Sequence, residues 1–205
     1  MTVSEEFGDI DIYVFDQLQK GRIRQGDRVL DAGCGSGRNV VYMMRAGIEV
    51  WAVDANPLAV DEVRALAARL IPGLTPAQLT QRFRPASIED LPFPSAHFSV
   101  VMASAVLHFA ANDEAFDAML GSLWRVLAPG GLFFSRLATS IGVESRIEPV
   151  GDRRYRLPDG STRYLPDESM LMDRSTRLGG QLLDPLKTTL VQNQRAMTTW
   201  VLKKV

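Results

Sequence analysis

A short glycine-rich loop carries the residues with the clearest chemical potential. Asp31 is followed by three glycines at alternate positions, Gly33, Gly35 and Gly37. Glycine lets the backbone turn sharply and approach a ligand without a Cβ in the way. A second carboxylate, Asp54, follows 23 residues after Asp31. The pattern predicts a site whose ligand comes close to the backbone and meets two carboxylates.

Two familiar ligand-binding loops do not fit this segment. A phosphate-binding P-loop requires Lys and then Ser or Thr after its last glycine, where this chain has Arg38 and Asn39. A dinucleotide-binding loop requires Gly-x-Gly-x-x-Gly/Ala. A count from Gly33 ends on Arg38, and a count from Gly35 ends on Val40. The loop therefore predicts a ligand of another kind.

The two aspartates indicate what that ligand carries. Asp31 ends an expected strand, where its charge would repel a pyrophosphate and attract a cation. Asp54 ends the next expected strand, where a carboxylate can accept hydrogen bonds from ribose hydroxyls. A ligand with an adenosine-type ribose and a positively charged tail without phosphate matches both. S-adenosylmethionine has these features in its ribose, sulfonium and α-ammonium groups.

Segments that resemble strands and helices alternate along the chain and must position this loop. The expected strands are 28–31, 49–54, 81–84, 98–103 and 132–137, and the expected helices are 11–20, 39–46, 56–70 and 113–127. Residues 186–191 and 197–203 predict an antiparallel hairpin. The fold class is therefore α/β, a doubly wound, Rossmann-like, seven-stranded and mainly parallel sheet with helices on both faces and a C-terminal hairpin. Such a sheet binds its ligand at the carboxyl ends of the strands.

Four segments in order carry a family resemblance, and together they span residues 28–134. They read RVLDAGCGSGRN, VWAVDANP, SIEDLPFPSAHFSVVMASAVLHF and LWRVLAPGGLFF. With them the chain resembles the class I S-adenosylmethionine-dependent methyltransferases, and the closing KTTLVQNQRAMTTWVLKK is similar to the last hairpin of their small-molecule type. The resemblance implies an enzyme that moves a methyl group from S-adenosylmethionine to a small-molecule acceptor and releases S-adenosylhomocysteine.

The resemblance also implies roles for individual residues. Asp31 would lie near the methionine ammonium, and Asp54 would hold the ribose. The other implied cofactor-binding residues are Gly33, Gly35 and Gly37 along the methionine and ribose, Ala55, Ser87 and Ile88 around the adenine, and Ala103 and Ser104 beside the methionine portion. Many relatives have Asp in place of Ser87, so we expect a weaker grip on the adenine, or one that Glu89 shares.

The candidates for direct chemistry are few. His108 follows the fourth expected strand and is a candidate general base, with a structural or methionine-facing role as the alternative. Cys34 has no neighbouring His, so a small buried thiol is favoured over a nucleophile. A single cysteine excludes a multi-cysteine zinc site, and no metal is expected.

The chain divides into regions within a single domain. We expect an N-terminal cap helix in 1–27, the cofactor-binding half in 28–141, an insertion in 142–180 and the C-terminal hairpin in 181–205. Residues 1–135 carry 11 basic and 16 acidic side chains, and residues 136–205 carry 12 and 8. The insertion, with a hairpin at 153–156 and 161–165, is either a lid or wall over the donor site or a solvated ornament. As a wall, its Tyr155, Tyr164 and arginines could hold an aromatic or anionic molecule.

Composition limits the function classes. The 205 residues are 46% hydrophobic and 23% charged, with a net charge of −1. This balance disfavours a nucleic-acid acceptor, and no apolar run is long enough to span a membrane, so a cytoplasmic protein is expected. An NAD(P)-dependent oxidoreductase and a non-catalytic S-adenosylmethionine-binding module remain as alternatives. The methyl acceptor, its reacting atom and the oligomeric state stay open.

Overall fold

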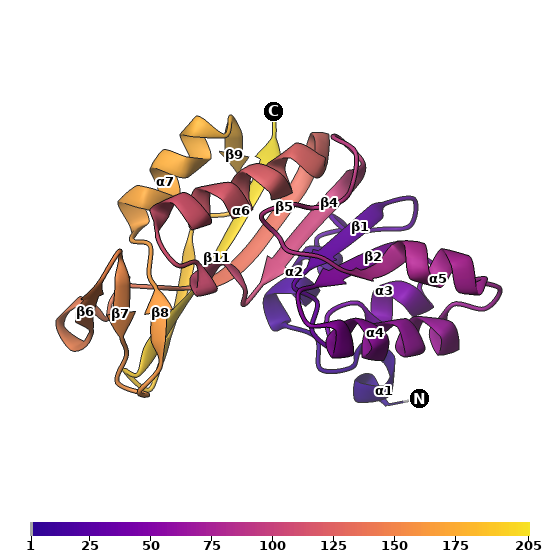
Figure 1. The fold of residues 1–205 in the computed structure, drawn as a ribbon, viewed down its shortest axis with the longest axis horizontal. Coiled ribbons are helices and arrows are strands. Elements are labelled where there is room, and N and C mark those ends of the chain that lie inside the picture. The colour runs from indigo at the N-terminus through magenta and orange to yellow at the C-terminus, as the bar shows by residue number, and fades with distance from the viewer. Residues whose placement is uncertain (1) are drawn as a thin grey trace.

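The computed structural model describes residues 2–205, the side chain of Ser4 excepted, and is built around one twisted sheet (Figure 1). Its strand order is β10-β11-β5-β4-β1-β2-β3. The strands are β1 (Arg28–Ala32), β2 (Glu49–Asp54), β3 (Phe83–Pro85), β4 (Phe98–Ser104), β5 (Leu127–Thr139), β10 (Lys187–Val191) and β11 (Arg195–Lys204). Pairing is parallel from β3 through β5, whereas β11 pairs antiparallel with both β5 and β10. The predicted fold class is confirmed, and a short further strand, β9 (Gly180–Leu182), pairs with the end of β11.

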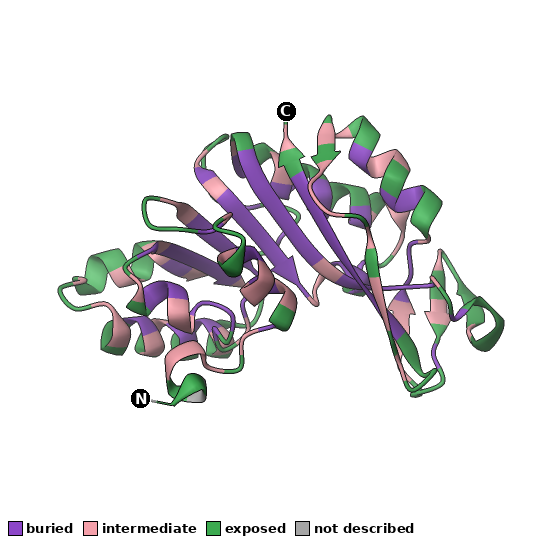
Figure 2. Cartoon of the chain, turned by 180° about the vertical axis from the view of Figure 1, so that it is seen from behind, coloured by how far each residue is buried: buried purple, intermediate pink, exposed green. Residues whose placement is uncertain are grey.

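Helices cover both faces of the sheet (Figure 1). Alternate residues of a strand point to opposite faces. Accordingly Leu30 and Phe133 pack with α6 and α7, whereas Val29 and Phe134 pack with α2, α3 and α4. The helices are α1 (Val3–Phe7), α2 (Ile12–Gln19), α3 (Val41–Arg45), α4 (Pro57–Leu70), α5 (Pro76–Arg82), α6 (Asp113–Val126) and α7 (Glu168–Arg177). Figure 2 shows the central strands as the buried middle layer.

Local sequence explains most of these boundaries. Asn56 caps α4 by accepting a hydrogen bond from the Leu58 N–H, and Pro57 occupies the first turn. The third strand is a correction, because Gln81 and Arg82 belong to α5 and β3 begins at Phe83. α5 starts with a capping box in which Thr75 and Gln78 bond each other's backbone N–H. This short helix was not predicted from the sequence.

The insertion of residues 142–180 forms a small sheet and a helix. Its strands are β6 (Glu148–Gly151), β7 (Arg154–Arg156) and β8 (Thr162–Tyr164), in that order. The predicted hairpin is β7 and β8, and β6 and α7 are additions to the prediction. α7 buries only Met170, Leu171 and Ser175, so its sequence carries a weak apolar pattern.

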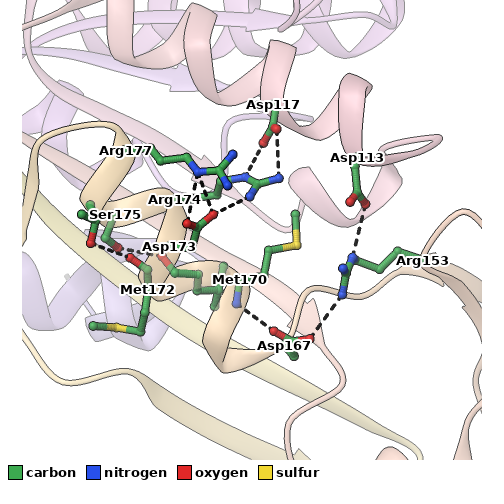
Figure 3. Close-up of polar contacts among 12 residues, drawn as sticks. Asp113, Asp117, Arg153, Asp167, Met170, Met172, Asp173, Arg174, Ser175 and Arg177 are labelled. Atoms are coloured by element: carbon green, nitrogen blue, oxygen red, sulfur yellow. Dashed lines mark hydrogen bonds and ion pairs between the residues drawn. The ribbon is translucent and has the colours of Figure 1, made fainter.

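Ion pairs fasten the insertion to α6 (Figure 3). The Arg153 guanidinium lies 3.2 Å from a carboxylate oxygen of Asp113 on α6 and 3.2 Å from one of Asp167, which caps α7. Arg174 reaches Asp117 at 2.6 Å. Between them the Tyr164 hydroxyl donates to Asp113 at 2.8 Å, and Tyr164 is fully buried against Phe116. The expectation that Tyr164 could hold a ligand is therefore wrong, because its ring is part of the core.

None of the helices described within residues 2–205 combines the length and the apolar character needed to cross a bilayer.

Candidate active site

A cavity of about 390 Å³ opens where β1, β2 and β4 end, and we call it the glycine-loop cavity. Six of the predicted residues line it: Gly33, Gly35, Asp54, Ala55, Ser87 and Ile88. The sequence had not singled out other parts of its wall, Ala86, Ala105, Val106, Phe109 and Met119. The topology thus brings the tips of β1 and β2 and the loop after β3 into one site.

Asp54 is held between two loops. Its Oδ2 accepts a hydrogen bond from the Gly35 N–H at 2.9 Å, and its Oδ1 accepts one from the Asn56 N–H at 2.8 Å. The carboxylate is half-buried at the cavity wall and each oxygen keeps a further lone pair. It can therefore accept additional hydrogen bonds from a ligand in a fixed orientation.

The three glycines have different roles. Gly33 has φ +77°, and a Cβ there would lie 2.4 Å from Val106 Cγ2. Gly37 has φ +85°, and its Cβ would meet Val63 of α4 at 2.6 Å. A Cβ on Gly35 would meet no atom within 4 Å, so its Cα faces open space. Gly33 and Gly35 line the cavity, whereas Gly37 lets the loop pack against α4 and is not part of the wall.

Asp31 is a buried carboxylate near the end of β1, and it does not itself line the glycine-loop cavity. It is 1% exposed, and neither carboxylate oxygen has a hydrogen-bond partner among the described residues. Burial raises the pKa of Asp31 to about 7, Arg38 opposes that shift, and Asp54 adds to it. An unpaired buried charge is costly, so this position favours a cation beside it.

One part of the wall of the glycine-loop cavity contains the residues expected near an adenine. The Ser87 hydroxyl donates to the Glu89 carboxylate, so the two side chains form one polar group in the wall. Ile88 is buried, and Phe109 exposes 60% of its surface at the rim. A role of Ser87 and Glu89 at an adenine stays a prediction, and the two side chains are close enough to act together.

The end of β4 differs from the prediction. Ala103 and Ser104 are buried within the strand, and they line neither the glycine-loop cavity nor the cavity that adjoins it. Ala105 stands in the wall instead, in a left-handed conformation with φ +61°. The sequence does not predict this place for Ala105, because the turn of the backbone puts it in the cavity wall and its type of side chain does not.

A second cavity of about 260 Å³ adjoins the first, and Ala105 lines both. We call it the arginine cavity. Its wall combines the end of the glycine loop, the turn after β4, the end of β5, the insertion and the β10–β11 hairpin. The residues are Arg38, Ala105, His108, Arg136, Ala138, Leu157, Asp159, Ser161, Arg163, Val191, Arg195 and Met197. Part of the insertion therefore lines the arginine cavity, whereas none of its residues lines the glycine-loop cavity and β6 is exposed along its length. Tyr155 lies outside this wall.

His108 is buried at the side of the arginine cavity. Its Nδ1 accepts a hydrogen bond from the Ala138 N–H at 3.0 Å. Burial, together with the positive charges of Arg163 and Arg195, lowers the pKa of His108 to about 4. The ring is therefore neutral at pH 7.

The N-terminal helix α2 reaches this cavity through its cap. Asp11 caps α2 and lies 2.9 Å from the Arg136 guanidinium and 3.8 Å from that of Arg38. The Tyr13 hydroxyl is 2.7 Å from the Thr189 hydroxyl of β10. Asp11 thus neutralises part of the positive charge at this end of the sheet.

Cys34 is 5% exposed and packs in the core beneath the loop, as predicted. Burial raises the pKa of its thiol, which disfavours the reactive thiolate. The described residues contain no group of three or more His, Cys, Asp or Glu side chains that could hold a metal ion.

The methyltransferase domain family model matches residues 30–135, just over half of the chain. A tRNA U34 carboxymethyltransferase of Idiomarina loihiensis is 32% identical over 181 residues, which are 86% of this chain and 52% of that protein. The chain spans about half the length of the curated relatives it matches.

Solved structures share the fold. A SAM-dependent methyltransferase from Methanosarcina mazei has a TM-score of 0.72 at 19% identity, over 92% of this chain and 97% of that chain. A Burkholderia thailandensis 1,6-didemethyltoxoflavin-N1-methyltransferase, solved with 1,6-didemethyltoxoflavin and S-adenosylhomocysteine, has a TM-score of 0.69 at 20% identity, over 98% of this chain and 80% of that chain.

The chain therefore belongs to the methyltransferase domain family, and its fold is that of the class I S-adenosylmethionine-dependent methyltransferases. The resemblance found in the sequence is confirmed. The match does not favour an NAD(P)-dependent oxidoreductase.

Proposed function

We propose that this chain catalyses methyl transfer from S-adenosylmethionine to a small-molecule acceptor. The observation that carries the proposal is the buried, unpartnered carboxylate of Asp31 in β1, two residues before Gly33 of the glycine-loop cavity. A cationic ligand would stabilise this group, and the α-ammonium of S-adenosylmethionine is such a cation. The residues present therefore fit the cofactor that the family uses.

Three groups of residues would hold the cofactor. Asp31 binds the ammonium, and Asp54 accepts hydrogen bonds from the ribose hydroxyls. Ser87, Ile88 and Glu89, which lie in the wall of the glycine-loop cavity, would surround the adenine. When bound, S-adenosylmethionine supplies a methyl group activated by its sulfonium.

The chain itself contributes alignment and exclusion of water. Ala105 lies at the junction of the two cavities, so a donor in the glycine-loop cavity would face an acceptor in the arginine cavity. Holding two reactants in line accounts for a large part of the rate of such a displacement. A general base is needed only for an acceptor that loses a proton during transfer.

A small acceptor is favoured by the size of the arginine cavity. Its volume of about 260 Å³ suits a compact molecule, and five separate parts of the chain enclose it, at 38, 105–108, 136–138, 157–163 and 191–197. The names of two similar proteins indicate acceptors as different as a tRNA and 1,6-didemethyltoxoflavin. The net charge of −1 provides no general attraction for a polynucleotide.

The binding of S-adenosylhomocysteine tests this function. We expect it to raise the melting temperature, whereas NAD⁺ and NADP⁺ leave it unchanged. The variant Asp54→Ala should weaken S-adenosylhomocysteine binding by ~1–3 kcal/mol, about 5- to 150-fold, because ribose hydroxyls lose a charged acceptor. Isothermal titration calorimetry measures the change.

Asp61→Ala is the matched control, since Asp61 is an exposed aspartate of α4 outside both cavities. Circular dichroism of both variants checks that they fold. Stabilisation by NAD⁺ and none by S-adenosylhomocysteine would overturn the proposed function, and an unchanged affinity of the Asp54 variant would remove Asp54 from the site.

A further inference from the structure

The arginine cavity carries more positive than negative charge. Arg38, Arg136, Arg163 and Arg195 line it. Asp11 pairs with the first two, at 3.8 Å from Arg38 and 2.9 Å from Arg136. The carboxylate in the wall is Asp159, which accepts hydrogen bonds from the Ser161 N–H and hydroxyl and lies 3.9 Å from Arg195. Four arginines therefore face two carboxylates.

Arg163 is the arginine whose charge is least compensated. Within residues 2–205 it forms no ion pair at 4.0 Å or less, and it is half-buried. Its guanidinium lies over the Phe109 ring at 4.8 Å, and its Nη1 donates to the Thr162 carbonyl at 2.8 Å. Phe109 lines the glycine-loop cavity, so Arg163 stands close to where the two cavities adjoin. A guanidinium fixed in this way presents its remaining N–H groups as a fork for an oxyanion.

His108 adds a neutral donor to the same wall. A neutral imidazole carries one proton, and Nδ1 already accepts the Ala138 N–H. The proton therefore resides on Nε2, for which no partner is present among the described residues. In this tautomer Nε2 can donate a hydrogen bond but cannot remove a proton from an acceptor.

We propose that the arginine cavity binds the methyl acceptor through an oxyanion, a carboxylate or a phosphate, held by Arg163 and Arg195 with the His108 Nε2–H as a further donor. The proposal rests on the proposed function, because it assigns the acceptor class for the same site. Leu157, Val191 and Met197 provide the apolar part of the wall for the body of the acceptor.

The experiment uses the full chain saturated with S-adenosylhomocysteine. The probes are benzoate, hexanoate and phenyl phosphate, with benzamide, hexanamide and phenol as their uncharged counterparts. We expect at least one anion to raise the melting temperature and its counterpart to leave it unchanged. Comparing the responses to benzoate and hexanoate with the response to phenyl phosphate shows whether the oxyanion is a carboxylate or a phosphate.

Arg163→Gln tests the residue itself. It should weaken binding of the responding anion about 10- to 100-fold, the loss expected for charge-assisted hydrogen bonds. Arg154→Gln is the matched control, because Arg154 is an exposed arginine of the same insertion outside the arginine cavity. It should change the affinity less than twofold.

Several results would overturn the proposal. They are equal responses to the anions and their counterparts, no response to any anion, equal binding by the Arg163 and Arg154 variants, and retention of unfractionated tRNA without a response to the anions. Binding of S-adenosylhomocysteine is measured first on the same samples. Its absence would contradict the proposed function, and its presence with a failed anion response would contradict only the acceptor class.

Discussion

Asp31 is a carboxylate that the fold buries without giving it a partner. Its pKa of about 7 means that the ligand-free protein holds a proton on Asp31 over part of the neutral range. An ammonium beside it would favour the ionised form and lower that pKa. Ligand binding and ionisation of Asp31 are therefore linked.

This linkage gives a prediction for a single residue. At pH 6, binding of S-adenosylhomocysteine should release up to one proton, and its affinity should rise with pH until about pH 7. Asp31→Asn should weaken binding and remove both effects, because its amide does not ionise. Calorimetry in buffers of different ionisation enthalpy counts the protons, and equal proton release by the wild type and the variant would contradict the assignment.

At the scale of elements, the glycine loop joins three pieces of the fold. The Gly33 and Cys34 N–H groups both bond the Val53 carbonyl of β2, and the Gly35 N–H bonds Asp54. The turn after β4 packs against Gly33 through Val106. The loop therefore keeps its shape through contacts with β2 and with the turn after β4.

Gly33→Ala should damage this junction. The new Cβ would lie 2.4 Å from Val106 Cγ2, at a φ of +77° that L residues rarely adopt. Positive φ costs ~1–2 kcal/mol and overpacking costs ~1–3 kcal/mol, so we expect a loss of roughly 2–5 kcal/mol in the free energy of unfolding. Urea denaturation measures it.

Gly35→Ala is the matched control, since its Cβ would meet no atom within 4 Å, although its φ is also positive. Gly35→Ala should lose only the part of the free energy of unfolding that the positive φ costs. Adding Val106→Ala to Gly33→Ala should restore part of the stability lost in the Gly33 variant. Equal destabilisation by the two alanines would show that contact with Val106 does not matter.

The elements that the sequence predicted are those with strong local signals. β1, β2 and β4 are short runs of mainly buried, apolar residues, and α4 begins at an Asn-Pro pair. α7 was missed because it is polar and buries three residues, and α5 because none of its residues is fully buried. Hydrophobic periodicity predicts an element only where a face is buried.

The candidate site shows the same limit. The place of Asp54 in the cavity wall was predictable because strand ends in a parallel sheet meet at one edge. Sequence position does not show which residues face a cavity, so Asp31, Gly37, Ala103 and Ser104 were predicted at the ligand although none of them lines the wall of either cavity. Tyr164 was a candidate ligand contact and instead packs in the core. The arginine cavity was not predictable as a cavity, since residues 157–163 and 191–197 meet Arg38 and His108 only in the folded chain.

At the scale of the whole molecule, two buried groups, Asp31 before the glycine loop and His108 in the arginine cavity, couple stability to pH in opposite directions. The folded pKa of Asp31 lies above its usual 3.8, so its contribution is present below about pH 4 and is lost as the pH rises through about 7. The folded pKa of His108 lies below its usual 6.5, so its contribution is present above about pH 6.5 and is lost as the pH falls through about 4. The full loss in the free energy of unfolding is about 4 kcal/mol for Asp31 and about 3 kcal/mol for His108.

These two dependences overlap between about pH 4 and 6.5, where they oppose each other. We therefore expect the free energy of unfolding of Asp31→Asn to rise with pH relative to the wild type, and that of His108→Asn to fall. The amide oxygen of the side chain introduced in place of His108 can accept the Ala138 N–H as Nδ1 does, which keeps this variant comparable. Urea denaturation at pH 4.5, 5.5 and 6.5 gives both differences, and the other carboxylates cancel because they are common to all three proteins.

Ligand binding should remove the pH dependence of stability that comes from Asp31 and leave the one that comes from His108. With saturating S-adenosylhomocysteine, Asp31 is ionised next to the ammonium and its dependence disappears, so the pH profile of the wild type should approach that of Asp31→Asn. His108 lies in the other cavity, and its dependence should remain. Parallel pH profiles of the wild type and Asp31→Asn without ligand would contradict a raised pKa at Asp31, and a ligand that changed only the His108 dependence would reverse the assignment of the two cavities.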